Sequence, residues 1–129
     1  MAEENSVPVG TVGWMDLTVD DAPGVRDFYR TVVGWSASDV NMGEYADFTM
    51  IVPATGEAVA GVCHARGSNA GMPPQWMIYI TVADLEASAA TCREHGGEVV
   101  VEPRAAGGGR FCVIRDPAGA ICGLYQAAV

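Results

Sequence analysis

The sequence contains one pattern of elements twice, and this internal repeat limits the folds that the chain can adopt. Asp116–Gly119 is a turn sequence, because proline presets the first corner and glycine tolerates positive φ after it. Residues 121–126 then alternate as a strand does. Earlier in the chain the pattern recurs, with 55–57 as the turn and Ala60–Ala65 as the strand, onto which Cys122–Ala127 aligns almost position by position. The chain is therefore predicted to be two copies of one module.

The first copy is predicted to form a strand, a helix and three more strands. Side chains alternate over residues 11–19, which indicates the opening strand. The helix is expected to begin at Asp21, which can cap it, with Pro23 in its first turn, and to end at Gly34. Its apolar stripe is Val25, Phe28, Tyr29 and Val32. Three further strands are predicted over 35–40, 45–52 and 58–65.

The second copy repeats these elements after a glycine- and proline-rich segment. Asp84 follows Val82 as Asp21 follows Val19, so a strand over 76–82 leads into a second helix, which Gly96 and Gly97 end. The stripe of this helix is Leu85, Ala89 and Cys92. Three more strands are predicted over 98–102, 110–115 and 120–126, with a hairpin turn at 107–109.

This order predicts an α+β fold of two βαβββ modules, each a curled mixed sheet with a helix on its outer face. The modules span residues 11–66 and 75–127 within a single domain of residues 11–129, joined by a linker at 67–74 and preceded by a tail at 1–10. The helices are expected to cover Met15, Leu17 and Val19 in one module and Ile78, Ile80 and Val82 in the other. The opposite faces then line a hollow, and its predicted lining is Trp14, Asp16, Thr18, Gly61, Cys63, Met77, Tyr79, Thr81, Gly123 and Tyr125.

Composition excludes several classes of function. The formal net charge of −9 argues against nucleic-acid binding, which needs a basic face, and it suits a cationic ligand. No apolar run approaches the length of a membrane span, and the acidic, polar start of the chain is unlike a signal peptide. The four cysteines have no Cys-x-x-Cys spacing, so reduced thiols in a cytoplasmic protein without a membrane partner are expected.

The paired modules, with the motifs Val19–Asp21 and Val82–Asp84, the pair Phe28-Tyr29 and the closing Asp116–Gly119 strand, resemble the vicinal oxygen chelate superfamily. That group includes glyoxalase I, bleomycin-resistance proteins and extradiol dioxygenases, and the resemblance covers roughly residues 10–127. It implies a ligand site in the hollow. It also implies a homodimer, because members commonly pair modules between chains.

Enzymes of this superfamily usually hold a divalent metal with histidine, glutamine or glutamate at four positions. Carried over to this sequence, those positions are Trp14, Gly61, Met77 and Gly123. None of these side chains offers a ligand for a hard cation, since methionine is a soft thioether and the others lack a suitable donor. We therefore expect no metal and no other cofactor.

Two histidines and one carboxylate remain to be weighed. His64 shares strand parity with Val62, which turns it away from the hollow, and a structural or surface role is favoured. His95 follows the second helix, where a cation suits the helix dipole, so capping is favoured. Asp16 is the more interesting candidate, because a carboxylate at mid-strand in an enclosed hollow is costly unless it is hydrogen-bonded or used. A structural role, in which Asp16 bonds Tyr79, Tyr125 or a nearby backbone group, is favoured over a role as ligand acceptor or general base.

The predicted function is binding of a small organic molecule without a metal, as in sequestration by bleomycin-resistance proteins. The predicted ligand-binding residues are Trp14, Asp16, Cys63, Met77, Tyr79 and Tyr125. The alternative is an enzyme, either a lyase or isomerase with Asp16 as base and Tyr79 or Tyr125 as acid, or a metal-dependent enzyme, dioxygenase-like for example, with ligands elsewhere. Cys63 is disfavoured as a nucleophile because burial raises the pKa of a thiol.

Overall fold

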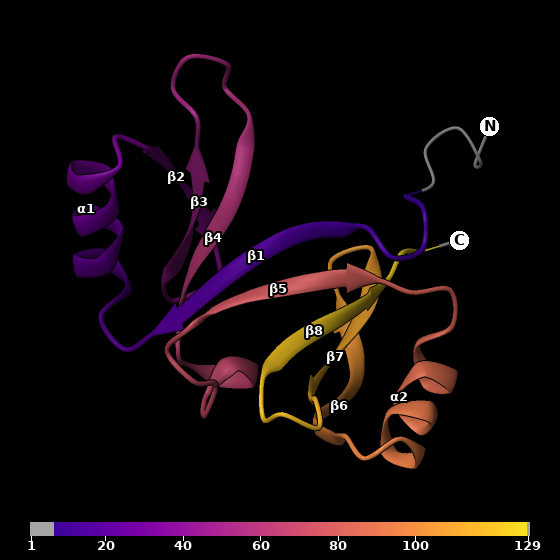
Figure 1. Ribbon diagram of the computed structural model, residues 1–129. Helices are drawn as coiled ribbons and strands as arrows, with labels where there is room; N and C mark the ends of the chain where they lie inside the picture. Colours follow the sequence, from indigo (N-terminus) through magenta and orange to yellow (C-terminus); the bar gives the residue numbers. More distant parts are fainter. Residues whose placement is uncertain (1–6, 129) are drawn as a thin grey trace. The chain divides into compact units, whose positions relative to one another are not determined.

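The computed structural model describes residues 7–128 and confirms the predicted α+β architecture. Strand, helix and three strands follow one another twice along the chain (Figure 1). The described chain divides into two compact units: an N-terminal unit of residues 14–76, and a C-terminal unit of residues 77–128 together with 7–13. Each unit has four strands, one helix and a core cluster. The module boundaries and the linker predicted from the sequence remain predictions.

The N-terminal unit carries one helix on a four-stranded sheet. Its elements are β1 (Val12–Val19), α1 (Ala22–Val32), β2 (Ser36–Asn41), β3 (Ala46–Ile51) and β4 (Ala58–His64), followed by a short 3-10 helix, η2 (Gly67–Asn69). The strands lie in the order β2-β3-β4-β1, with β1 parallel to β4 and the other pairs antiparallel. The helix lies across one face and contacts β2, β3 and β4 (Figure 1). The other face is left without a helix of this unit.

The core of the N-terminal unit lies between α1 and its sheet. The buried residues are Ala22, Phe48, Met50, Ala60 and Val62, with Val19, Val25, Tyr29, Trp35 and Trp76 packed against them. The apolar stripe on the helix is narrower than predicted, because Phe28 and Val32 are 56% and 62% exposed. Met15 was also expected beneath the helix, but it is 38% exposed.

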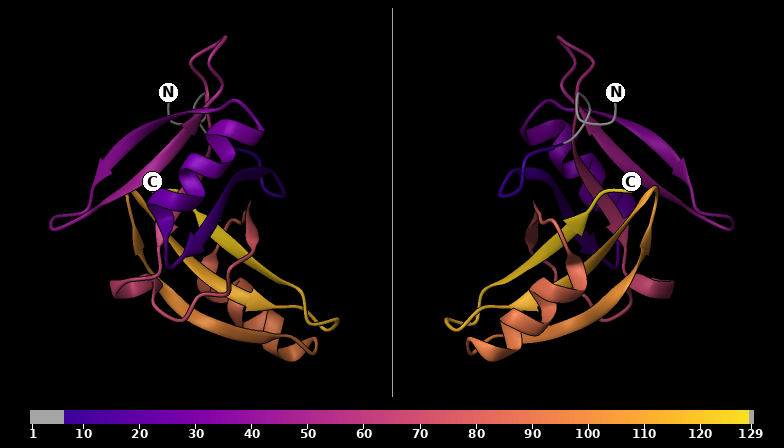
Figure 2. Two further views of the ribbon diagram at one scale, coloured as in Figure 1. Left: turned by 90° about the vertical axis from the view of Figure 1, so that its left-hand side faces the viewer. Right: turned by 90° about the vertical axis from the view of Figure 1, so that its right-hand side faces the viewer.

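The C-terminal unit repeats the arrangement with β5 (Trp76–Thr81), α2 (Leu85–Glu94), β6 (Glu98–Ala106), β7 (Gly109–Arg115) and β8 (Ile121–Gln126). The strands lie in the order β5-β8-β7-β6, with β5 parallel to β8. The helix packs against β6, β7 and β8 (Figure 2). Its core consists of Leu85, Cys112 and Leu124, with Ile80, Val82 and Ile114 packed against them. Ile78, like Met15, is exposed rather than covered by the helix.

The strand predicted over 98–102 continues to Ala106. The predicted strand ended at Glu102, and the next residue, Pro103, has no N–H to donate to a ladder. In the structure the register against β7 shifts twice, between Val99 and Val101 and between Val101 and Arg104. These irregularities accommodate the proline within the strand. The predicted hairpin turn follows, with Gly107 at a φ of +57°.

The helix starts are capped as the sequence predicted. The Asp21 carboxylate accepts the backbone N–H of Gly24 at 3.0 Å, and the Asp84 carboxylate accepts that of Ala87 at 3.1 Å. Beyond the ends, Gly34 and Gly96 have φ values of +93° and +90°, a region that glycine enters without strain.

His95 occupies the C-cap of α2, as expected. Within residues 7–128 no helix is long and apolar enough to cross a membrane. The predicted tail at 1–10 lies partly outside the described residues. Its described end is attached to the C-terminal unit, since the Gly10 N–H donates to the Thr81 carbonyl at 2.9 Å.

Candidate ligand-binding site

Asp16 in β1 lies opposite Gly61 in β4, on the sheet face away from α1. The indole N–H of Trp14 donates to Asp16 Oδ1 at 2.6 Å, so the carboxylate is oriented by a side chain of its own strand. A β-carbon added to Gly61 would collide with a carboxylate oxygen of Asp16 and stand 3.3 Å from its carboxyl carbon. Asp16 therefore occupies the space that a side chain on Gly61 would need.

Tyr79 in β5 lies opposite Gly123 in β8 in the same way. A β-carbon added to Gly123 would collide with the Tyr79 ring and stand 3.1 Å from its Cγ. The ring also packs edge-on against Phe111, with 6.1 Å between centroids. Both units thus share one arrangement, in which a glycine on the last strand (β4 or β8) leaves space for a side chain of the first strand (β1 or β5). That side chain is a carboxylate in one unit and an aromatic ring in the other.

Asp47 in β3 is a buried carboxylate that the sequence analysis did not single out. Its Oδ1 accepts the backbone N–H of His64 at 2.8 Å and lies 3.1 Å from His64 Nδ1. The Cys63 thiol also hydrogen-bonds to this carboxylate. A signal was present, because Asp47 alternates with Phe48 in a predicted strand just as Asp16 alternates with Leu17. Asp47 was therefore the second mid-strand carboxylate on the face away from the helix.

Cys63 lies beside these two carboxylates, and its pKa shows the electrostatics of the face. Burial raises the pKa of the thiol first, and the negative charges of Asp16 and Asp47 raise it further. A thiol in this setting stays protonated near neutral pH and is a poor nucleophile. Cys63 can donate a hydrogen bond here, but it does not supply a thiolate.

The predicted site residues divide between the two units. Trp14, Asp16 and Cys63 belong to the N-terminal unit, and we call them, with Asp47, the polar face. Met77, Tyr79 and Tyr125 belong to the C-terminal unit, where Met77 is buried and the backbone at Gly109 closely approaches the Tyr125 ring. That the two groups line one hollow remains a prediction.

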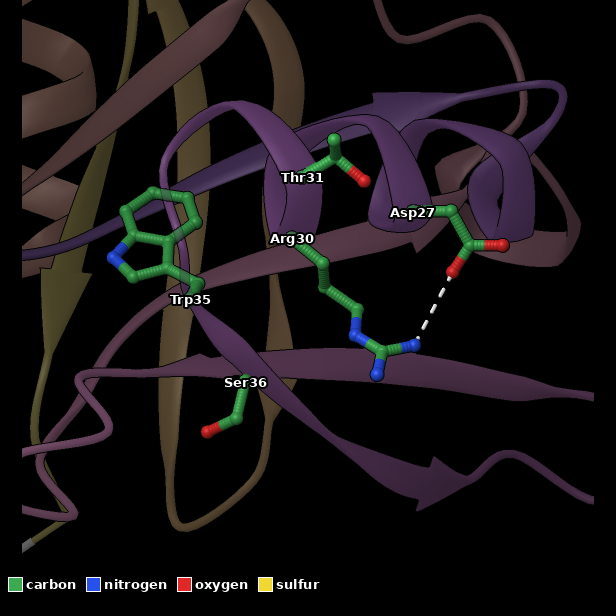
Figure 3. Close-up of a pocket in the computed structure, with 5 residues that line it drawn as sticks. All are labelled: Asp27, Arg30, Thr31, Trp35 and Ser36. Carbon is green, nitrogen blue, oxygen red and sulfur yellow. Dashed lines mark hydrogen bonds and ion pairs between the residues drawn. The ribbon is translucent and has the colours of Figure 1, made fainter.

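A separate open pocket of about 450 Å³ lies beside the last turns of α1 (Figure 3). It is lined by Asp27, Arg30, Thr31, Trp35 and Ser36. The Asp27 carboxylate binds the guanidinium of Arg26 at 2.9 Å and that of Arg30 at 3.5 Å. One carboxylate is thus shared by two guanidinium groups, so these three side chains together carry one net positive charge.

Residues 11–121 match the family model described as the Glyoxalase/Bleomycin resistance protein/Dioxygenase superfamily. The chain belongs to this superfamily. The resemblance inferred from the repeated motifs is therefore confirmed. The superfamily fold also explains why two βαβββ modules recur within 129 residues.

Relatives within the superfamily have diverse names. The chain is 33% identical, over 98% of its length, to "Putative glyoxylase CFP32" of Mycobacterium bovis, and 33% identical, over 93%, to the anthracycline biosynthesis protein DnrV of Streptomyces peucetius. It spans about half the length of these relatives, 49% and 48%. Among solved structures, methylmalonyl-CoA epimerase of Streptomyces coelicolor matches with a TM-score of 0.60 and 18% identity, over 95% of this chain and all of that one. That likeness supports the fold alone.

The four positions that hold a metal in superfamily enzymes do not fit one here. Gly61 and Gly123 have no side chain, and the neighbouring Asp16 and Tyr79 fill the space where one would begin. Trp14 uses its indole N–H on Asp16, and Met77 offers only a soft thioether. Across residues 7–128, no three histidine, cysteine, aspartate or glutamate side chains are grouped to hold an ion. That the protein works without a metal remains a prediction.

Proposed function

We propose that the chain binds a small organic molecule over the polar face, with Asp16 as the acceptor for a cationic or donor-rich group and without a bound metal. One observation carries this proposal: the ligand positions Gly61 and Gly123 are glycines whose space Asp16 and Tyr79 occupy. In the N-terminal unit, the Asp16 carboxylate fills the space that a metal-coordinating side chain at position 61 would need. The side chain that lies there is a carboxylate, oriented by the Trp14 indole.

The electrostatics support a ligand that donates hydrogen bonds. Asp16 and Asp47 are two carboxylates on a face where the neighbouring thiol is kept neutral. The whole chain carries a formal charge of −9, which favours the approach of cations. The indole of Trp14 adds a flat apolar surface beside Asp16, and such a pairing suits an aromatic or heterocyclic amine.

The relatives support the class of ligand. One is named a glyoxylase and another an anthracycline biosynthesis protein, so small organic molecules fit both names. Sequestration of such a molecule, as in bleomycin-resistance proteins, needs no turnover. The homodimer expected from the resemblance, and a cytoplasmic location, remain predictions, and light scattering at micromolar concentration measures the former.

A thermal-shift screen of cationic and aromatic compounds, with metal analysis of the same purified sample, tests the proposal. We expect hits among amines, no stoichiometric divalent ion, and no rise in melting temperature with added Zn²⁺, Ni²⁺ or Mn²⁺. Asp16→Asn should weaken binding of a hit by about 1–3 kcal/mol, the scale of a charged hydrogen bond left unmade. Asp39→Asn, which changes an exposed carboxylate on β2, is the matched control and should bind normally.

One equivalent of metal that survives dialysis, and is lost when polar-face residues are mutated, would contradict the proposal. Equal binding by Asp16→Asn and the unmodified chain would contradict the role of Asp16. The catalytic alternative is favoured by the 2.6 Å hydrogen bond from Trp14, since a general base must be held in one orientation. If Asp16 is a base that works with Tyr79 or Tyr125, Asp16→Asn should abolish turnover of a hit while binding survives.

A further inference from the structure

Five side chains of the N-terminal unit, near the end of β4, are linked by ring–ring and cation–π contacts. The Tyr45 and His64 rings lie 5.0 Å apart between centroids, and the His64 and Phe48 rings lie 6.1 Å apart. The guanidinium of Arg66 lies 4.1 Å from the Tyr45 ring centroid, and that of Arg26 lies 4.5 Å from the Phe48 ring centroid. A histidine is thus held between two aromatic rings, each of which carries an arginine.

His64 is oriented by a buried carboxylate. Asp47 Oδ1 lies 3.1 Å from its Nδ1 and also accepts its backbone N–H, so both the ring and the backbone are held. Among the described residues, every buried side-chain nitrogen or oxygen has a hydrogen-bond partner. His64 Nε2 has no hydrogen-bond partner in that part of the chain, so it is not one of these buried atoms. Nε2 is therefore not fully sealed from solvent, and the His64 side chain is 14% exposed. A carboxylate on one ring nitrogen leaves the other to face an incoming group.

Arg66 differs from five of the other six arginines. Arg26, Arg30, Arg93, Arg110 and Arg115 each form an ion pair with an aspartate or glutamate. Within residues 7–128, Arg66 has no such carboxylate and is held only by the Tyr45 ring. In a chain with 16 acidic residues and 7 basic ones, a guanidinium with no acidic partner is notable. Arg26 is the direct comparison, because it also lies over a ring but is neutralised by Asp27.

From these contacts we infer that His64, Arg66 and Tyr45 form a binding site for the oxyanion of a small molecule, a carboxylate or a phosphate. Arg66 supplies a planar pair of donors, and His64 supplies Nε2–H when the ring is protonated. Tyr45 contacts both His64 and Arg66, and its ring face holds the guanidinium. Asp47 is a positioning residue, because it fixes the ring of His64 and does not face the ligand. The inference is independent of the proposed role of Asp16.

The presence of only two histidines allows a direct test by NMR. The ring signals of His64 and His95 are followed at about pH 6 while inorganic phosphate replaces chloride at constant ionic strength. We expect the His64 signals to shift and saturate below about 50 mM phosphate. His95, the exposed C-cap of α2, serves as the internal reference and should not show saturation. A parallel titration with acetate shows whether a carboxylate is preferred.

Arg66→Gln should weaken phosphate or acetate binding about tenfold or more, the effect of losing a charged donor pair. Arg30→Gln changes an exposed arginine of the same unit and should leave the titration unchanged. Asp47→Asn should weaken binding less than Arg66→Gln, and circular dichroism establishes that each variant is folded. Parallel, non-saturating shifts of both histidines would overturn the inference. So would a folded Arg66→Gln variant that binds as tightly as the unmodified chain.

Discussion

The two units share their backbone plan but differ in the chemistry of the sheet face away from the helix. Opposite its glycine, the N-terminal unit places Asp16, with Asp47 and Cys63 on the same face. The C-terminal unit places Tyr79 opposite its own glycine, in contact with Phe111. The repeat therefore fixes the strand order and the space beside the glycine of the last strand. The first-strand side chain that fills this space, Asp16 or Tyr79, sets the chemistry of each face.

The largest expected effect comes from filling the room at the two glycines. Gly123→Ala should destabilise the protein by about 2–3 kcal/mol, because the new methyl group meets a ring that is packed against Phe111. Gly61→Ala should cost less, about 1–2 kcal/mol, because a carboxylate can rotate away. Urea denaturation measures both. Gly108→Ala, where a β-carbon would meet nothing within 4 Å, is the control. Equal losses of unfolding free energy in all three variants would contradict the prediction that filled space at Gly61 and Gly123 is the cause.

Thiol reactivity should distinguish the electrostatics of the two units. Burial raises the pKa of Cys112 from 9.0 to about 11, so at pH 8 its thiolate fraction, and its alkylation rate, should be about 100-fold below those of a free thiol. The pKa of Cys63 is raised by Asp16 and Asp47 as well as by burial. Asp47→Asn should therefore speed alkylation of Cys63 by iodoacetamide and leave Cys112 unchanged. Peptide mass spectrometry reads each site, and a rate at Cys63 insensitive to Asp47→Asn would argue against this account.

The helix caps should give the smallest difference. Asp21→Ala removes the side-chain acceptor of α1 and should cost about 1–2 kcal/mol in thermal or urea unfolding. Asp84→Ala should cost less, about 0.5–1 kcal/mol, because the Gln126 side chain also accepts the backbone N–H of Leu85 at 2.7 Å. Asp39→Ala provides the baseline for loss of an exposed aspartate. A larger loss for Asp84→Ala would show that the second acceptor does not contribute.

The elements and their caps were predictable because they depend on residues close together in the sequence. Asp21, Asp84 and Gly34 specify helix ends through local hydrogen bonds and backbone angles, and all three behave as expected. Strand parity also placed Val62 in the core under α1, as found. Exposure of Met15 and Ile78 was not predictable, since it depends on how far each helix extends along its strand.

The site was less predictable because its contacts cross strands. Parity put Asp16 and Gly61 on one face, but only the register Asp16↔Gly61 shows that one occupies the space of the other. His64 was assigned a structural or surface role, and its pairing with Asp47 joins residues 17 positions apart. Sequence alternation gives the sheet face on which a side chain lies. Its cross-strand partner depends on the register between strands, which alternation alone does not determine.

The occupied space above Gly61 and Gly123 bears on how readily this scaffold could change its chemistry. A coordinating side chain introduced at position 61 would collide with Asp16, and one at position 123 would collide with Tyr79. A route to an ion-binding descendant through these two positions therefore requires two linked replacements in each half, and a coordinating side chain introduced first would be destabilising. Directed evolution by single steps is thus favoured in one order only. A designer would have to shorten the side chain on the first strand before placing a ligand on the last.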